Sequence, residues 1–118
     1  VSVPFEVDTD TQMQLEISER INDAPTAQTY YEAARYLQET DQEAKRALDY
    51  LKKAINLGGD TYYYHRVKSL VEADLGNYKA AIQSAKKSLA IAAKLEKDEF
   101  VRMNKKNIKI WETLLAKK

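Results

Sequence analysis

Apolar residues recur every three or four positions along most of the chain, which is the spacing of one face of an α-helix. Six helical segments are predicted in this way, at about 10–22, 26–39, up to 57, 61–74, 78–95, and from 98 almost to the C-terminus. Their buried faces are expected to carry Met13, Ile17 and Ile21; Tyr30, Ala33, Ala34 and Leu37; Ala44, Ala47, Leu48, Leu51, Ala54 and Ile55; Tyr64, Val67 and Val71; and Ala81, Ile82, Ala85 and Leu89.

Short polar turns separate these segments. Thr40 and Asp41 are candidate N-caps for the third segment. The stretch GGD after it supplies a glycine C-cap, and Asp60 is the predicted N-cap of the fourth segment. The sequence therefore favours regular helices joined by tight connections.

The first seven residues follow a different pattern, in which apolar and polar positions alternate. Positions 1, 3, 5 and 7 are apolar, and a period of two is typical of a half-buried β-strand. Pro4 has no backbone N–H and is best tolerated in an edge strand. We interpret residues 1–9 as the remnant strand of an upstream β-rich domain, or else as an extended arm packed on the helices.

The helical pattern also repeats. When the third segment is shifted by 34 residues it falls on the fifth, and Ala47 meets Ala81. The second segment falls on the fourth at the same shift, and the third falls on the first when the shift is reversed. Two units are therefore expected, at about 27–60 and 61–94, inside a helical domain over residues 10–118.

A helix–turn–helix period of 34 residues resembles that of the tetratricopeptide repeat, and so does the stretch LGNYKAAIQSAKKSLAIA. Gly76 resembles the turn glycine of that motif, Tyr78 the aromatic residue that opens its second helix, and Ala81 its small residue at a close helix approach. Ser88 stands where the motif has another alanine. The large aromatic residue and the Leu-Gly pair of the first helix are missing. The resemblance implies an all-α fold of antiparallel helix pairs, with the last helix as a cap.

A second resemblance is to an uncharacterised family of bacterial exported proteins and lipoproteins. It rests on the order of the stretches TYYEAARYL, ALDYLKKAI, KSLVEADLGNYKAAIQSAKKSL and EFVRMNKKNIKIW, preceded by VPFEV. In that family a β-rich domain of unknown function precedes tetratricopeptide-like helices. The resemblance implies a periplasmic or exported protein, and it supplies no catalytic residues.

Charge is unevenly distributed, although the whole chain has a net charge of only +1. Residues 1–43 contain ten acidic and two basic side chains and carry a net charge of −8, whereas residues 44–118 contain eight acidic and 17 basic ones and carry +9. Such polarity can steer a partner or favour head-to-tail packing. A solvated surface with segregated charges shows the same pattern and is the simpler interpretation.

Candidates for catalysis or metal binding are few. The chain has no cysteine and one histidine, which leaves no ligand set for a structural zinc ion. His65, Ser69 and Glu72 could form a Ser–His–acid arrangement on the fourth helix. A nucleophile needs a strained, exposed setting and an oxyanion hole, and one regular helix offers neither. We therefore expect no enzyme activity, no catalytic or metal-binding residue and no cofactor.

The fourth segment opens with TYYYHRVKSL, which brings three tyrosines, the histidine and an arginine together in sequence. In helical repeats the first helix of each unit lines the concave face, where peptides bind. The apolar stripes of the second and fourth segments lie one residue earlier than the repeat motif predicts, so two registers are open. The groove residues are Tyr63, Arg66 and Leu70 with Glu32 and Tyr36 in the motif register, or Tyr62, His65 and Ser69 with Tyr31 and Arg35 in the stripe register.

Other side chains of these helices are expected to be structural. Tyr30 and Tyr64 should pack between helices. Lys68 should lay its aliphatic stem over the core and keep its charge in water.

The last predicted helix, residues 98–116, has two sharply different faces. A basic stripe consists of Arg102, Lys105, Lys106 and Lys109, and the opposite face carries Phe100, Met103, Trp111, Leu114 and Leu115 with Asn104 and Asn107 among them. A basic amphipathic helix can bind a membrane surface or an acidic partner. In a helical array the last helix more often caps the final unit. We expect the cap, with the two asparagines hydrogen-bonded inside it.

The sequence thus predicts a non-enzymatic protein-interaction or scaffolding module that binds a peptide or a neighbouring domain on its concave face. One alternative is a purely structural C-terminal domain that stabilises an upstream β-rich domain. Another is attachment to a membrane surface through the basic last helix. Nucleic acid is not an expected partner, because the basic surface is neither large nor continuous enough.

Overall fold

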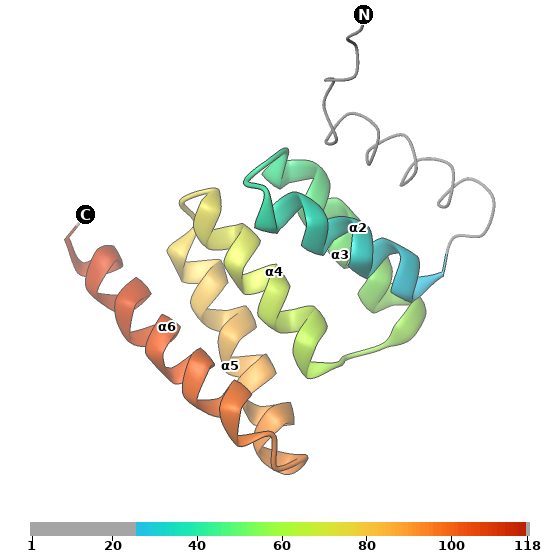
Figure 1. Cartoon of the computed structure of the whole chain (residues 1–118). Coiled ribbons are helices and arrows are strands. Elements are labelled where there is room, and N and C mark those ends of the chain that lie inside the picture. The colour runs from blue at the N-terminus through green and yellow to red at the C-terminus, as the bar shows by residue number, and fades with distance from the viewer. Residues whose placement is uncertain (1–25, 118) are drawn as a thin grey trace, which may run out of the picture.

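The computed structural model describes residues 26–117, and within that range the chain forms five α-helices and no strand (Figure 1). They are α2 (Ala27–Glu39), α3 (Ala44–Gly58), α4 (Tyr62–Asp74), α5 (Tyr78–Lys94) and α6 (Asp98–Ala116). The all-α class is confirmed for this part of the chain, and the predicted helix ends differ from the observed ones by at most one residue. The predicted helix at 10–22 and the predicted strand at 1–9 lie outside the described residues.

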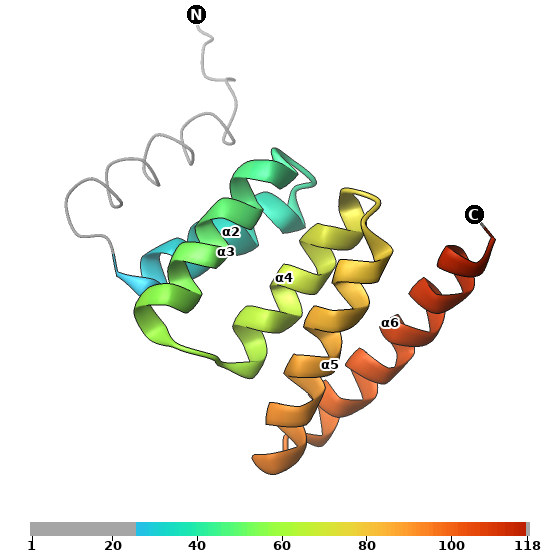
Figure 2. The same ribbon diagram turned by 180° about the vertical axis from the view of Figure 1, so that it is seen from behind.

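The helices follow one another side by side in the order of the sequence. α2 packs on α3, α4 on α5 and α5 on α6, while α3 also contacts α4. Figure 1 looks onto α2, α4 and α6, and Figure 2 shows α3 and α5 from behind. We call the first of these surfaces the α2–α4–α6 face. α4 lies at the centre of the array, between the two ends formed by α2 and α6.

Side-chain caps fix where the helices begin. The hydroxyl groups of Thr26 and Thr61 accept hydrogen bonds from backbone N–H groups three residues later, both at 3.1 Å. Asn77 caps α5 in the same way. The predicted cap at Asp60 is wrong, because the cap hydroxyl comes from Thr61. The N-cap of α3 is Glu43 and not Thr40 or Asp41, which lie in the turn that ends α2.

Three of the four connections in the described part of the chain have the same geometry. Just after the helix, each has a residue with a left-handed backbone, namely Asp41, Gly76 or Glu96, and the first connection has a second such residue in Glu43. The N–H of the residue that follows Asp41, Gly76 or Glu96 then binds a carbonyl five positions earlier, which satisfies a free group at the helix end. These bonds are Gln42 to Leu37 at 2.8 Å, Asn77 to Glu72 at 2.9 Å and Lys97 to Ala92 at 2.8 Å.

The connection between α3 and α4 is different. Gly59 has a φ of 89°, a conformation that glycine adopts without steric cost. Gly58, just before it, has no room for a side chain, since a Cβ atom there would lie 2.6 Å from the Cβ of Ala27. The end of α3 therefore packs directly against the start of α2.

Two hydrophobic clusters hold the array together, and α4 contributes to both. The first cluster joins α2, α3 and α4, and the second joins α5 and α6 with two partly buried residues of α4. The buried members of the first are Tyr31, Ala34, Leu37, Ala47, Leu51, Ala54, Tyr64, Val67 and Val71; those of the second are Ala81, Ile82, Ala85 and Trp111.

The predicted buried faces are largely confirmed, although five of their residues are only partly buried, namely Tyr30, Ala44, Leu48, Ile55 and Leu89. Tyr30 is only half-buried, and its neighbour Tyr31 lies in the first cluster instead. The ring of Tyr31 packs against Tyr64 with centroids 5.2 Å apart, a contact between helices that periodicity alone cannot show. Within residues 26–117, none of the helices combines the length and the apolar character needed to cross a bilayer.

Candidate functional site

The polar side chains of α4 project to two opposite sides of the helix. A helix turns by about 100° per residue, so positions 63, 66 and 70 lie roughly half a turn away from positions 65, 68 and 72. Arg66 and His65, adjacent in sequence, therefore belong to different surfaces. Each surface is a separate candidate site.

The first surface gathers four aromatic rings around Arg66. The ring of Tyr63 lies 5.1 Å from that of Tyr31 on α2, and the ring of Tyr62 lies 4.8 Å from that of Phe100 on α6, both edge to face. The guanidinium carbon of Arg66 lies 5.7 Å from the centre of the Phe100 ring. We call these five residues the Arg66 strip. It crosses three helices on the α2–α4–α6 face.

Arg66 is half-buried without an ion pair. Among the described residues no carboxylate oxygen lies within 4.0 Å of its guanidinium, and its Nε atom is buried with no hydrogen-bond partner. Burial lowers the pKa of Arg66, because the charged form loses water. Glu39 and Glu99 are the acidic groups close enough to influence it.

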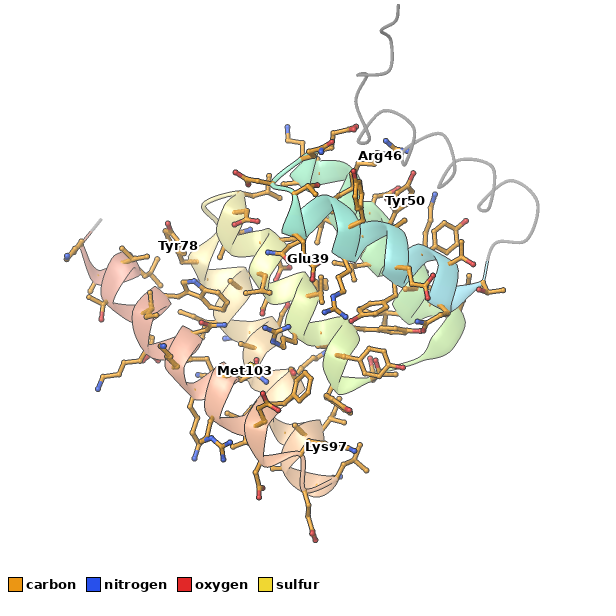
Figure 3. The ribbon with its side chains drawn as sticks, in the orientation of Figure 1. Glu39, Arg46, Tyr50, Tyr78, Lys97 and Met103 are labelled. Atoms are coloured by element: carbon orange, nitrogen blue, oxygen red, sulfur yellow. The ribbon has the colours of Figure 1, made fainter. Side chains whose placement is uncertain are left out.

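Glu39 is itself engaged by Arg35 on the same helix. The Nε atom of Arg35 donates to a carboxylate oxygen of Glu39 at 2.8 Å, and that hydrogen bond raises the pKa of Arg35. Both side chains are more than half exposed, so the pair stabilises the helix little. Figure 3 shows the side chains of this face, with Glu39 on α2 and Met103 on α6 labelled. The Arg35–Glu39 pair lies near Arg66, but neither of its side chains forms an ion pair with Arg66.

The Arg66 strip contains residues from both predicted registers. Tyr63 and Arg66 come from the motif register, and Tyr62 and Tyr31 from the stripe register, although Tyr31 is buried at 7% exposure. The other predicted residues lie elsewhere: Leu70 packs on the second cluster, Tyr36 on the first, Glu32 is exposed on α2, and His65 is buried on the opposite side of α4. The sequence predicts only that Phe100 lies on the apolar face of the last helix. Its contacts with Tyr62 and Arg66 join two helices, and a sequence pattern does not show such contacts.

The Ser–His–acid arrangement, which was not expected on one regular helix, is not formed. The Ser69 hydroxyl donates to the carbonyl oxygen of Arg66, and the Nε2 atom of His65 lies 2.9 Å from Oδ1 of Asp60. The hydrogen bond from His65 lowers the pKa of the exposed Asp60 carboxyl group. Ser69 and His65 thus have separate partners, and neither is positioned to activate the other.

His65 belongs instead to a pocket of about 320 Å³ between α4 and α5, which we call the α4–α5 pocket. Its lining consists of His65, Lys68, Glu72, Ala80, Gln83, Ser84 and Lys87. The buried Glu72 carboxylate accepts from Ser84 at 2.6 Å and from the Lys68 ammonium group at 2.8 Å. The expectation that the Lys68 charge lies in water is therefore wrong.

Comparison of the chain with protein-family models, curated protein sequences and solved structures found no match. The tetratricopeptide and exported-protein resemblances stay predictions. Within residues 26–117 no three histidine or acidic side chains lie close enough together to bind a metal ion.

α6 is fixed to the array by a buried polar chain. The Nδ2 atom of Asn104 donates to the Ser88 hydroxyl at 2.8 Å, and that hydroxyl donates to the carbonyl oxygen of Tyr62 at 2.7 Å. The expectation that Asn104 is hydrogen-bonded inside the interface is confirmed, although its partner is a side chain. The chain links α6, α5 and α4.

The outer side of α6 is more exposed than expected. Leu115, assigned to the packed face, is 39% exposed, and Ile110 is 45% exposed. The basic stripe residues Arg102, Lys105, Lys106 and Lys109 are exposed as well. Nothing among the described residues covers this side, and the membrane-surface alternative stays a prediction.

Proposed function

We propose that this chain is a non-enzymatic, tetratricopeptide-like interaction module that binds a peptide segment across the α2–α4–α6 face. The Arg66 strip is the proposed contact surface. In proteins built from helix pairs, the first helices line a groove that accepts extended or helical peptides. α2 and α4 occupy that place here, and α6 extends the surface through Phe100.

The observation that carries the proposal is the unpaired state of Arg66. Its guanidinium is half-buried against Phe100, and the described residues give it no carboxylate partner within 4.0 Å. A charge removed from water without a partner is unfavourable. A carbonyl or carboxylate oxygen on a bound peptide would offset that cost, because a guanidinium can donate two parallel hydrogen bonds to it.

The rings around Arg66 favour the same use. Tyr62 and Tyr63 are half-buried, so part of each ring remains available to a partner. Tyrosine and arginine are enriched at the residues that dominate binding energy in protein interfaces. Two helix pairs make a short surface, and we expect a modest affinity.

A random peptide library displayed on phage tests this proposal, because no partner has to be known beforehand. Peptides selected on the wild-type protein should bind at least about tenfold more weakly to the Tyr63→Ala/Arg66→Ala double variant. Arg66→Lys should also lose affinity, because an ammonium group lacks the planar fork of the guanidinium. Binding is measured by fluorescence anisotropy of the synthetic peptides.

The matched control is Lys52→Ala/Lys79→Ala, which removes exposed charges from α3 and α5 and should leave peptide binding unchanged. Circular dichroism must show that every variant keeps its helical spectrum. Equal binding of the selected peptides to the double variant and the wild type would overturn the proposal. A library that yields no peptide above background would favour the alternative in which the helices only stabilise a neighbouring domain.

A further inference from the structure

The α4–α5 pocket lies where the preceding helix pair has two tyrosine rings. Caps and turns align the two pairs: Thr61 corresponds to Thr26, and Gly76 to Asp41, so α4 follows α2 after 35 residues. α5 begins at residue 78 and α3 at residue 44, which is a distance of 34. The difference arises because Glu43 adds one residue to the first turn.

This alignment places His65 at the position of Tyr30 and Ser84 at the position of Tyr50. The two tyrosine rings lie 5.8 Å apart, and the ammonium group of Lys53 lies 5.6 Å from the centre of the Tyr30 ring. The smaller His65 and Ser84 leave the α4–α5 pocket between the second pair of helices. The α2–α3 pair thus has an aromatic contact at the position where the α4–α5 pair has a polar pocket.

The acidic group of the pocket is already engaged. Ser84 and Lys68 each occupy one oxygen of the Glu72 carboxylate, and Lys68 also lies 3.2 Å from the Ser84 hydroxyl. An ammonium group has three protons to donate, so Lys68 retains one. The buried Lys68–Glu72 pair is electrically neutral.

Of the remaining polar groups in the pocket, Lys87 is a donor, and the Gln83 carboxamide offers both donors and an acceptor. Within residues 26–117, Lys87 forms no ion pair within 4.0 Å, and no hydrogen bond is formed by the side chain of Gln83. Asp60 is the acidic group that Lys87 influences, and Asp60 already accepts from His65. The lining therefore has an excess of positive charge and of unused donors.

We propose that the α4–α5 pocket binds a carboxylate group, supplied by a small free dicarboxylate or by an acidic side chain of a partner protein. Lys87 and the remaining proton of Lys68 would pair with the carboxylate, and Gln83 would donate a further hydrogen bond. The pocket volume lies at the small end of the range for ligand sites. The site lies on the opposite side of α4 from the Arg66 strip and does not depend on it.

NMR of the single histidine tests the proposal directly. His65 is the only histidine in the chain and lines the pocket, so its ring signals report on occupancy. Titration with glutarate, or with a capped Ala-Glu-Ala peptide, should shift these signals to saturation.

Two lysine variants separate binding from general charge effects. Lys87→Ala should weaken binding at least about tenfold, since it removes a charged partner. Lys86→Ala removes the same charge from an exposed neighbouring position on α5 that does not line the pocket, and it should change affinity less than about twofold.

The choice of ligand decides the source of the carboxylate. If glutarate saturates the signals and the peptide does not, the natural ligand is a free small molecule. If the peptide binds as tightly as glutarate or more tightly, the carboxylate comes from a side chain of a partner protein. Shifts that grow linearly with concentration and are reproduced by sodium chloride at equal ionic strength would overturn the proposal. Equal losses in Lys87→Ala and Lys86→Ala would overturn it as well.

Discussion

At the scale of single residues, the buried polar chain from Asn104 through Ser88 to Tyr62 shows why a hydroxyl replaces alanine in α5. Ala54 occupies the matching position in α3 and is fully buried. Ser88 has the same small volume but also links α6 to the carbonyl of Tyr62. Its hydroxyl uses both its donor and an acceptor site, which makes the polar contact compatible with burial.

Replacing Ser88 or Asn104 with alanine should therefore be costly and non-additive. Ser88→Ala leaves the buried Asn104 amide group without its observed partner, at about 1–3 kcal/mol. After Asn104→Ala the Ser88 hydroxyl still donates to the carbonyl of Tyr62, so the cost comes from the lost hydrogen bond and the space left in the interface. The double variant should be less destabilised than the sum of the two single variants by about 1 kcal/mol, as measured by urea unfolding.

Thr113→Ala is the control for this pair. Its hydroxyl bonds to the carbonyl of Lys109 within the exposed side of α6, and its loss should change the free energy of unfolding by less than about 0.5 kcal/mol. Strictly additive effects of the Ser88 and Asn104 substitutions would show that the hydrogen bond between these two residues contributes no coupling energy to stability.

At the scale of helices, the close approach between the end of α3 and the start of α2 depends on Gly58. Alanine there should destabilise the protein, although alanine is the better helix former by about 1 kcal/mol. The added methyl group would meet the Cβ of Ala27 and the ring of Tyr64. Overpacking of this kind costs about 1–3 kcal/mol.

The measurement is the thermal midpoint of Gly58→Ala followed by circular dichroism. Asn56→Ala, at an exposed position on the same helix, is the control and should not lower the midpoint. A midpoint for Gly58→Ala that equals or exceeds that of the wild type would contradict the predicted clash between α3 and α2.

The helices were predictable from sequence because their signals are local. Apolar spacing located α2 to α6, and the glycine signals at Gly59 and Gly76 marked two of the helix ends. The caps were harder to predict, because Asp60 and Thr61 are both suitable cap residues. In the structure Thr61 caps the helix and Asp60 pairs with His65. Glu43, with its left-handed backbone, adds a residue to one turn, which made the shift between first helices look like 34 instead of 35.

The candidate sites were predictable only in part, because sequence signals are local and contacts between helices are not. TYYYHRVKSL offered two alternatives on one helix, Tyr63, Arg66 and Leu70 or Tyr62, His65 and Ser69, and the Arg66 strip takes residues from both. The contribution of Phe100 depends on how α6 approaches α4, and that geometry has no local signal. The α4–α5 pocket was missed because it depends on how α5 packs against α4, which brings Ser84 beside Lys68 and Glu72.

At the scale of the whole molecule, the division into two hydrophobic clusters predicts two coupled units of stability. Leu51 is fully buried in the first cluster, and Trp111, the only tryptophan, lies in the second. Leu51→Ala should cost about 2–5 kcal/mol. In arrays of helices the loss is felt most by the nearest neighbours, so the unfolding midpoint seen by circular dichroism should fall more than that seen by Trp111 fluorescence.

Ile82→Ala in the second cluster provides the mirror-image comparison. It should lower the fluorescence midpoint at least as much as the circular dichroism midpoint, because Ile82 shares a cluster with Trp111. If both probes give coincident midpoints for both variants, the array unfolds as a single cooperative unit and the division has no thermodynamic meaning.

The exceptional connection between α3 and α4 also marks where the protein could be divided. It is exposed around Gly59 and Asp60, as tolerated break points usually are. A break there would give one chain with α2 and α3 and another with α4 to α6, whose internal turns all stay intact. The two chains would carry matching halves of the first cluster, with Val67 and Val71 on one side and Leu51 on the other. These are the properties required of a split reporter, in which two fragments reassemble only when fused partners bring them together.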